Sequence, residues 1–123
     1  MPENPLSGRR ILVVEDDYFL ADDLQRRLRA SGAIVLGPVP SVEGALGLVD
    51  RETVDAASID VKLGVEMAYP VADALRARGV PFLLTTGYDQ ASLPERYAKA
   101  PRLEKPVAVE EVLRALGRLL NAA

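Results

Sequence analysis

Five polar residues each follow a segment that predicts a β-strand, and together they could take up a phosphoryl group. Glu15 and Asp16 follow the first such segment, and Asp60, Thr86 and Lys105 follow three later ones. A carboxylate can attack phosphorus to form an acyl phosphate, so Asp60 is the candidate acceptor. The transferred group then needs positive charge and a hydroxyl donor beside it, and Lys105 and Thr86 are of the right types.

The acidic members of this group imply a divalent cation. Glu15, Asp16 and Asp60 would repel one another, and would raise one another's pKa values, if they met in one place. Mg²⁺ removes this conflict, because it is usually bound by one or two carboxylates, water and a phosphate oxygen. The chain has no His and no Cys. A metal must therefore be held by oxygen atoms, which favours Mg²⁺ or a similar hard cation.

Each of these residues has a simpler interpretation when it is taken alone. An acidic run such as residues 15–17 is more often a solvated loop or a helix start, where its charge favours the helix dipole. A single Asp after a strand is usually a cap, a Lys-Pro pair is usually a loop, and Thr86 before Gly87 would form a turn. Tyr88 could equally be a packing residue. The functional interpretation therefore depends on the five side chains meeting at one edge of the fold.

The elements that must position these residues alternate between strand and helix. The apolar runs predict strands at residues 11–14, 33–36 (broken by Gly37-Pro38), 56–59, 82–85 and 102–104. The patterns between and after them predict four helices. The first contains Leu20, Leu24 and Leu28 and closes near Gly32, and the second has Ser41 as its N-cap. The third has Pro70 in its first turn and ends at Gly79, and the last covers residues 109–121. Residues 89–100 should form the remaining helix, but Leu93 and Tyr97 are its only large apolar side chains. We expect that fourth helix to be short or mobile.

Five strands alternating with helices predict an α/β fold with a doubly wound parallel sheet. Right-handed crossovers favour a flavodoxin-like (βα)5 arrangement with strand order 2-1-3-4-5. In such sheets the ligand lies at the carboxyl ends of the strands, which is where the five polar residues fall. We expect one domain at residues 9–123, preceded by a flexible segment at residues 1–8.

Composition excludes several classes of protein. The chain has 123 residues and a formal net charge of −3, and it lacks the clustered Lys and Arg typical of nucleic-acid binding. Its N-terminus has no apolar core of a signal peptide, and no apolar run approaches the ~20 residues that span a bilayer. We therefore expect a cytoplasmic protein that binds neither nucleic acid nor membrane.

Four ordered motifs resemble those of the receiver domain of two-component response regulators. They lie at residues 11–17, 58–63, 84–88 and 104–106, and the resemblance extends from about Arg9 to Leu120. Residues 82–88 (FLLTTGY) also resemble the single-domain regulators that carry a so-called FATGUY motif.

The resemblance implies a role for each acidic residue. Asp60 would receive the phosphoryl group from a phosphohistidine on a histidine kinase or phosphotransfer protein, since this chain has no His of its own. Asp16 would be the direct metal ligand, and Glu15 would act through water. The backbone carbonyl of Lys62 would complete the protein ligands of Mg²⁺.

The resemblance also implies how the phosphoryl group is read. Thr86 would turn its hydroxyl toward one phosphoryl oxygen and Lys105 would pair with another, and the Lys105–Pro106 bond would be cis. Asp17 would cap the first helix. The protein would then signal to a downstream protein partner, as a monomer or weak dimer, rather than turn over a metabolite as an enzyme does.

The chain departs from the family pattern at one position. The switch aromatic normally lies three residues before the lysine, where this chain has Arg102, so Tyr88 is the candidate to take over its role. The weak helix at residues 89–100 could become ordered on phosphorylation. Two alternatives stay open: a phosphorylation-independent, receiver-like interaction module, and a metal-dependent phosphatase, which Lys62 disfavours because a second acid is expected there.

Overall fold

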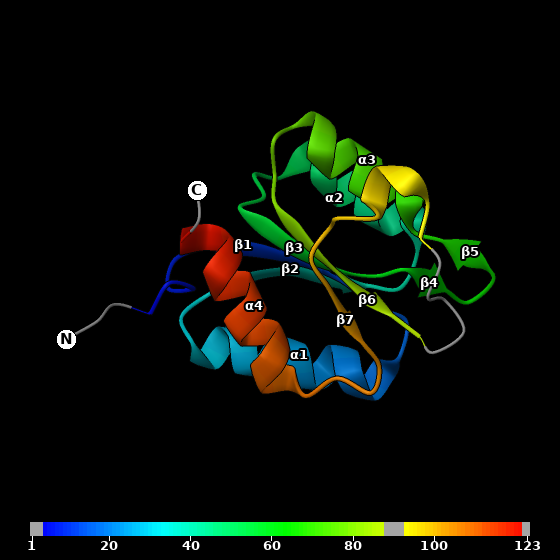
Figure 1. Ribbon diagram of the computed structural model, residues 1–123. Helices are drawn as coiled ribbons and strands as arrows, with labels where there is room; N and C mark the ends of the chain where they lie inside the picture. Colours follow the sequence, from blue (N-terminus) through cyan, green and yellow to red (C-terminus); the bar gives the residue numbers. More distant parts are fainter. Residues whose placement is uncertain (1–3, 88–92, 122–123) are drawn as a thin grey trace.

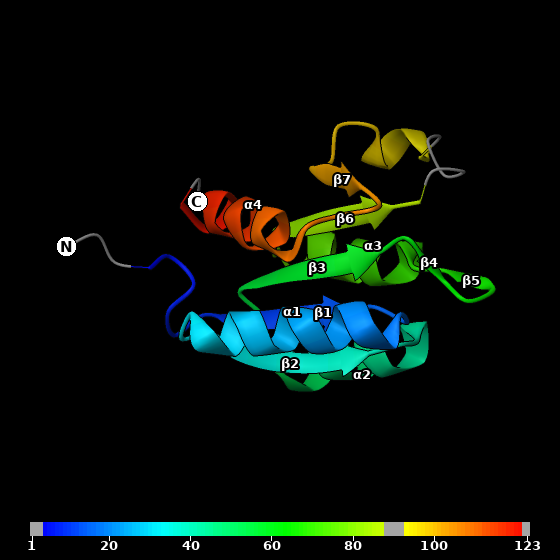
Figure 2. The ribbon, with the colours of Figure 1, turned by 90° about the horizontal axis from the view of Figure 1, so that it is seen from below.

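A parallel five-stranded sheet forms the centre of the molecule. The computed structural model describes residues 4–87 and 93–121. The strands of the sheet are β1 (Arg10–Val14), β2 (Ile34–Val39), β3 (Ala56–Asp60), β6 (Phe82–Thr86) and β7 (Arg102–Glu104). Every neighbouring pair is parallel, and the spatial order is β2-β1-β3-β6-β7 (Figure 2). This order is the predicted 2-1-3-4-5 arrangement.

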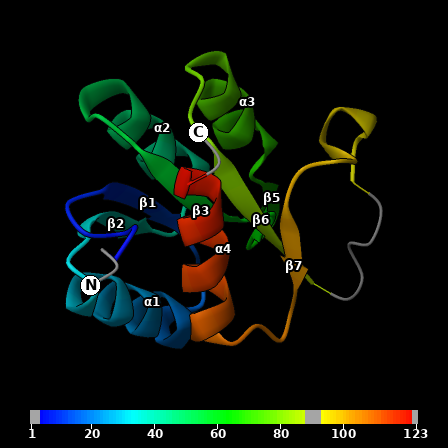
Figure 3. The ribbon, with the colours of Figure 1, turned by 60° about the vertical axis from the view of Figure 1, so that its left-hand side comes forward.

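Helices cover both faces of the sheet, as a doubly wound fold requires. The helices α1 (Tyr18–Ala30) and α4 (Val109–Asn121) lie side by side on one face, and α2 (Val42–Arg51) and α3 (Tyr69–Ala77) lie on the other (Figures 1 and 3). The fold is therefore flavodoxin-like, as predicted. Within the described ranges 4–87 and 93–121, no helix is long and apolar enough to cross a membrane.

The alternation of side chains along the strands divides the apolar interior into two cores. In β1, Leu12 and Val14 pack toward α2 and α3, whereas Ile11 and Val13 pack toward α1 and α4. All four are at most 1% exposed, which explains why this strand is a continuous apolar run and not an alternating one.

Two helix starts follow the chemistry predicted for them. The Asp17 side chain accepts hydrogen bonds from the amides of Phe19 and Leu20, and the Ser41 side chain accepts one from the amide of Gly44. Each cap satisfies amides that have no partner within the helix. Because Asp17 is used in this way, it fixes where α1 begins directly after the acidic pair.

The prediction that the second strand breaks at Gly37-Pro38 is wrong, because β2 continues to Val39. Leu12 pairs with Leu36 and Val14 with Val39, so β2 holds one extra residue in a bulge. Gly37 permits this with a φ of +93°, where a Cβ would lie 2.8 Å from the amide nitrogen of Val39. The strand then resumes, and the Glu15 amide donates to the Val39 carbonyl at 3.0 Å.

One short element was not predicted from the sequence, and another agrees with its prediction. A hairpin of β4 (Lys62–Leu63) and β5 (Glu66–Met67) follows directly after β3. Residues 93–100 contain a short 3₁₀ helix, Glu95–Tyr97, in agreement with the short element expected there. The remainder of that predicted helix, at residues 89–92, lies outside the described residues.

The segment before β1 is attached to the core beneath α1 and α4 through the side chain of Leu6. Leu6 is 3% exposed and belongs to the same cluster as Leu116 and Leu120 of α4. The Gly8 amide also donates to the Gly32 carbonyl at 2.8 Å. The flexibility of residues 1–8 and the domain boundary after them stay predictions.

Candidate functional site

The candidate residues lie at the carboxyl ends of four neighbouring strands. Glu15 and Asp16 follow β1, Asp60 ends β3, Thr86 ends β6 and Lys105 follows β7. The chain leaves β1 toward β2 on one side and later returns to β3 on the other. The space beyond β1 and β3 is therefore the topological switch point of the sheet, where ligands of this fold class bind.

Lys105 joins two buried carboxylates. Its Nζ lies 3.0 Å from Oδ2 of Asp60 and 3.3 Å from Oε2 of Glu15. Both acidic residues are 4% exposed, whereas the Lys105 side chain is 27% exposed. Backbone amides complete the arrangement, since Asp17 donates to Glu15 Oε2 at 3.0 Å and Lys62 donates to Asp60 Oδ1 at 3.3 Å.

Burial makes the two carboxylates difficult to ionise. It raises the pKa of Glu15 to about 7, and the charge of Asp60 adds to this effect against the opposing Asp17 amide and Lys105. Burial also raises the pKa of Asp60, although Lys105 opposes it. Burial alone would lower the pKa of Lys105, but the hydrogen bond to Asp60 and the charge of Glu15 outweigh it, and the pKa is raised.

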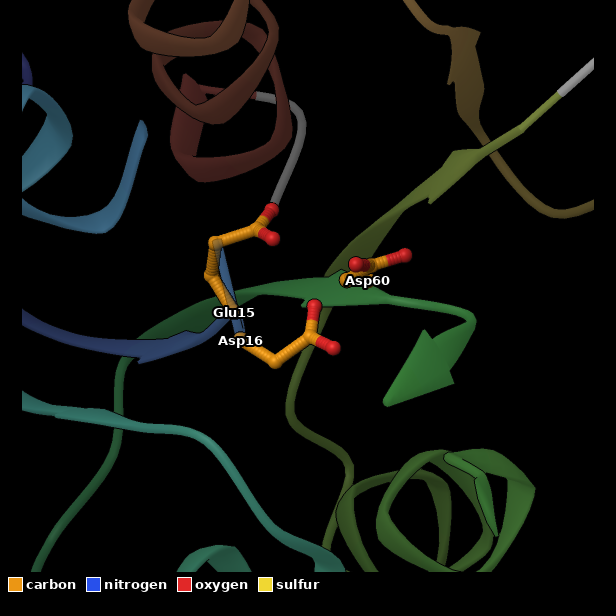
Figure 4. Close-up of side chains that lie close together, drawn as sticks. All are labelled: Glu15, Asp16 and Asp60. Atoms are coloured by element: carbon orange, nitrogen blue, oxygen red, sulfur yellow. The ribbon is translucent and has the colours of Figure 1, made fainter. Parts of the chain in front are cut away.

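Asp16 brings a third carboxylate to the same place from the surface. One oxygen from each of Glu15, Asp16 and Asp60 lies within 4.8 Å of the other two. Figure 4 shows Asp16 and Asp60 reaching toward the same space from the ends of β1 and β3. Oδ2 of Asp16 accepts a hydrogen bond from the Gly64 amide at 2.8 Å, so this exposed side chain has a fixed orientation.

These three residues fit a hard divalent cation. They offer carboxylate oxygens, the ligands that Mg²⁺ prefers. Lys105, which pairs with Glu15 and Asp60, compensates one negative charge of the three when all are ionised. An open cavity of about 310 Å³ lies over Asp16 and Asp60. It is lined by Asp16, Asp17, Asp60, Lys62, Gly64, Gly87 and Lys105.

The other predicted residues have different positions. Thr86 is 1% exposed, and its carbonyl accepts a hydrogen bond from the Lys105 amide at 2.8 Å. It lies beside the cavity but not among the residues that line it. The Lys62 side chain is exposed, and the Lys105–Pro106 bond is cis, as predicted. Tyr88 lies outside the described residues.

Two contacts of the site were not predicted from the sequence. The first is the direct ion pair of Glu15 with Lys105, because no pattern shows which carboxylate the lysine reaches. The second is the amide of Gly64 on Asp16. A glycine four residues after Asp60 was the available signal, but a single glycine in a polar stretch predicts only a turn.

Known proteins with similar sequences and structures are response regulators and receiver domains. SdrG from Sphingomonas melonis Fr1 is 39% identical, with a TM-score of 0.79 over 92% of this chain and 97% of SdrG. The receiver domain of sensor histidine kinase PA1611 from Pseudomonas aeruginosa PAO1, which has a magnesium ion in its active site cleft, is 27% identical. Its TM-score is 0.77 over 94% of this chain and 99% of that one.

A further relative, also a response regulator, matches this chain over half of its own length. The response regulator MprA from Mycobacterium sp. (strain KMS) is 36% identical over 119 residues, which cover 91% of this chain and 50% of MprA. The chain thus spans about half the length of the curated relatives that it matches. No protein-family model matches it. The carboxylates of Glu15, Asp16 and Asp60 form an acidic edge at the strand ends. From its fold, this acidic edge and its likeness to SdrG over nearly the whole of both chains, the chain belongs to the receiver domains of two-component response regulators.

Proposed function

We propose that this protein is a phosphoacceptor of a two-component phosphorelay. Asp60 accepts a phosphoryl group from a phosphohistidine on a histidine kinase or phosphotransfer protein, with Mg²⁺ bound beside it. The observation that carries the proposal is the Asp60 carboxylate itself, which is buried at the strand ends, 3.0 Å from an ammonium group and beside two further carboxylates.

The chemistry follows from the two oxygens of Asp60. A carboxylate oxygen attacks phosphorus and forms a P–O bond, while the P–N bond of the donor breaks and its electron pair stays on the imidazole. Bound Mg²⁺ supplies positive charge to the phosphoryl oxygens. The residues that would hold it are Asp16, Asp60 and the Lys62 carbonyl, with Glu15 acting through water.

Lys105 and Thr86 respond to the transferred group. Once Asp60 carries the phosphoryl group as an acyl phosphate, its carboxylate has lost its negative charge. Lys105 then pairs with a phosphoryl oxygen in place of the Asp60 carboxylate. The Thr86 hydroxyl binds another. Because the Lys105 amide is tied to the Thr86 carbonyl, the ends of β6 and β7 move together. With Arg102 at the usual aromatic position, Tyr88 is the candidate that transmits this change.

Two relatives support the proposal. A second structure of SdrG, from Pseudomonas melonis Fr1, is described as its BeF₃-activated conformation and is 38% identical to this chain, with a TM-score of 0.73 over 98% of this chain and 99% of that one. The PA1611 receiver has magnesium in the corresponding kind of cleft. Both are properties of those proteins, and here they favour the same use of the acidic edge.

The partners are proteins. Tyr18 and Phe19 are 74% and 81% exposed directly after the acidic stretch, and the hairpin residue Val65 is fully exposed. Exposed aromatic side chains of this kind are typical of protein interfaces. The phosphodonor protein therefore contacts the surface around Tyr18, Phe19 and Val65. The phosphorylated protein signals to a downstream protein by a change of conformation. It does so in the cytoplasm, as a monomer or weak dimer. The protein catalyses its own phosphotransfer and dephosphorylation and does not turn over a metabolite.

Phosphorylation by acetyl phosphate tests this function. With Mg²⁺ the wild type should migrate more slowly on a phosphate-affinity gel, and Asp60→Asn should abolish the shift. Asp50→Asn is the matched control, because Asp50 is an exposed aspartate that pairs with Arg78. An unmodified wild type, under conditions that modify a known receiver, contradicts the proposal. If such a protein still bound a partner, it would be a phosphorylation-independent interaction module.

A further inference from the structure

The hairpin of β4 and β5 supplies two backbone amides to the acidic site. The Lys62 amide donates to Oδ1 of Asp60 at 3.3 Å, and the Gly64 amide donates to Oδ2 of Asp16 at 2.8 Å. The Lys62 donor lies in β4, and the Gly64 donor lies in the turn directly after that strand. One short stretch of the chain therefore contacts the carboxylates at the ends of both β1 and β3.

The hairpin is held in place on both of its strands. On the inner strand, Leu63 is 2% exposed and belongs to the core beneath α2 and α3. At its base, the Ala68 amide donates to the Val61 carbonyl at 2.7 Å. On the outer strand, Glu66 Oε2 accepts from the Val42 amide at the start of α2 at 3.4 Å. The two amides are thus presented from a fixed support.

The turn of the hairpin depends on a glycine. Gly64 has a φ of +61°, in the left-handed region that other residues rarely adopt. A Cβ at this position would meet nothing within 4 Å. A side chain here would therefore be opposed by backbone conformation and not by crowding, which makes the residue suitable for a controlled substitution.

The amide of Gly64 leaves Asp16 able to bind a cation. A carboxylate has two oxygens and about four lone-pair positions, and the amide uses one of them on Oδ2. Asp16 is exposed, so its side chain would otherwise sample several rotamers and lose that freedom on binding metal. Groups that orient a metal ligand through a hydrogen bond typically change affinity by 10- to 100-fold when they are removed.

We propose that the β4–β5 hairpin positions Asp16 relative to Asp60 through the amides of Gly64 and Lys62, and so sets the affinity of the site for Mg²⁺. Gly64 is then a positioning residue, which acts through Asp16. The inference rests on the proposed function, in which these carboxylates hold the metal.

Two matched glycine substitutions test the inference. Gly64→Ala and Gly79→Ala both place a Cβ in open space at a positive φ, +61° and +71°, so both should lose a similar ~1 kcal/mol of stability. Only Gly64→Ala strains the amide that contacts Asp16. Calorimetric titration with Mg²⁺ should show binding weakened at least threefold in Gly64→Ala and unchanged in Gly79→Ala. Gly64→Asn, which tolerates the left-handed region, should recover most of the affinity.

The outcomes separate the inference from the proposed function. If the wild type shows no Mg²⁺ binding, the proposed function fails. If the wild type binds Mg²⁺ and Gly64→Ala binds it equally well, the positioning role alone is overturned. A measurement without a Gly64 variant gives a second test. The Gly64 amide should be protected from hydrogen exchange in the wild type and lose that protection in Asp16→Ala, and equal exchange in the two proteins would contradict the proposal.

Discussion

Lys105 pairs with two buried carboxylates, Glu15 and Asp60. This shared pairing affects how readily Glu15 ionises when no metal is bound. One ammonium group cannot compensate two charges that have also lost their water. The pKa of Glu15 is accordingly raised to about 7 by burial. Near neutral pH the metal-free site is therefore in a balance between a protonated and an ionised Glu15.

Glu15→Gln should stabilise the metal-free protein at pH 8. A carboxyl group whose pKa is higher in the folded than in the unfolded state contributes stability at low pH and loses it as the pH rises through the folded value, here about 7. At pH 8 the wild type carries this cost and the glutamine variant does not. Thermal unfolding in EDTA should show a gain of ~1 kcal/mol at pH 8 that shrinks toward pH 5. An equal gain at both pH values would contradict this explanation.

Mg²⁺ should stabilise the wild type through the same carboxylates. A ligand that binds only the folded state adds ~2.7 kcal/mol at a concentration 100 times its dissociation constant. The unfolding temperature at pH 8 should thus rise with MgCl₂, and Asp16→Asn should remove most of the rise. Asp22→Asn is the control, since Asp22 pairs with Arg26 on α1. Equal stabilisation of the wild type and Asp16→Asn would mean that the cation binds elsewhere.

Single residues show what the sequence could and could not reveal about the site. Asp60 and Asp16 were predicted because each follows a strand, and parallel strands bring their carboxyl ends to one edge. The reach of Lys105 to Glu15 was not predicted, because it depends on side-chain directions that no spacing encodes. The Thr86 prediction gave the right strand end but not its burial beside the cavity.

Among the elements, the short 3₁₀ helix has a stronger attachment than its sequence suggests. Tyr97 is fully buried and stacks on Tyr69 of α3, with ring centroids 5.8 Å apart. Arg76 lies over the Tyr97 ring at 4.4 Å, and Arg96 pairs with Asp73 at 3.0 Å. The Tyr97 hydroxyl donates to Asp73 as well. Side chains on one face of α3 therefore hold in place the segment that leads into β7.

Truncation of Tyr97 should loosen this segment. Tyr97→Ala should cost ~3 kcal/mol, as for other buried aromatic residues, and Tyr97→Phe only ~1 kcal/mol, because the ring remains and one hydrogen bond is lost. Urea denaturation monitored by circular dichroism measures both losses. Similar losses for the two variants would mean that the hydroxyl, and not the ring, holds the segment.

The elements that escaped sequence analysis share a physical reason. Lys62–Leu63 and Glu66–Met67 are two-residue strands, too short to show any periodicity. Gly37-Pro38 is typical of a break, and only the neighbouring strand shows that a bulge absorbs it. In contrast, the final helix was predicted to its observed bounds, because thirteen residues contain several repeats of its apolar face.

At the scale of the molecule, the N-terminal segment completes the core between α1 and α4. Leu6 is 3% exposed, and a Cβ on Gly117 of α4 would lie 3.1 Å from Cγ of Pro5. The glycine thus allows the segment to approach the helix closely. The segment lies far from the acidic edge along the sheet, since it precedes the first residue of β1 and the site follows the last.

Leu6→Ala should therefore lower stability without altering the site. We expect a loss of ~2–3 kcal/mol for a buried leucine and an unchanged affinity for Mg²⁺. Val65→Ala, at a fully exposed position, is the control and should change stability little. Chemical denaturation and calorimetry measure the two quantities. A stability equal to that of the wild type would show that residues 4–8 are loosely attached, in line with the flexible segment expected from the sequence.

The pairing of α1 with α4 has a consequence for how the chain is made. Leu24 and Leu28 of α1 pack with Val112, Leu116 and Leu120 of α4, which come from the opposite end of the sequence. A ribosome releases the chain from its N-terminus, so this apolar face of α1 and β1 emerges long before its cover is synthesised. The face packed on α2 and α3 can close during translation, whereas the other must wait for the last helix. In the meantime the nascent chain exposes an apolar surface, and surfaces of this kind make partly folded chains prone to aggregation.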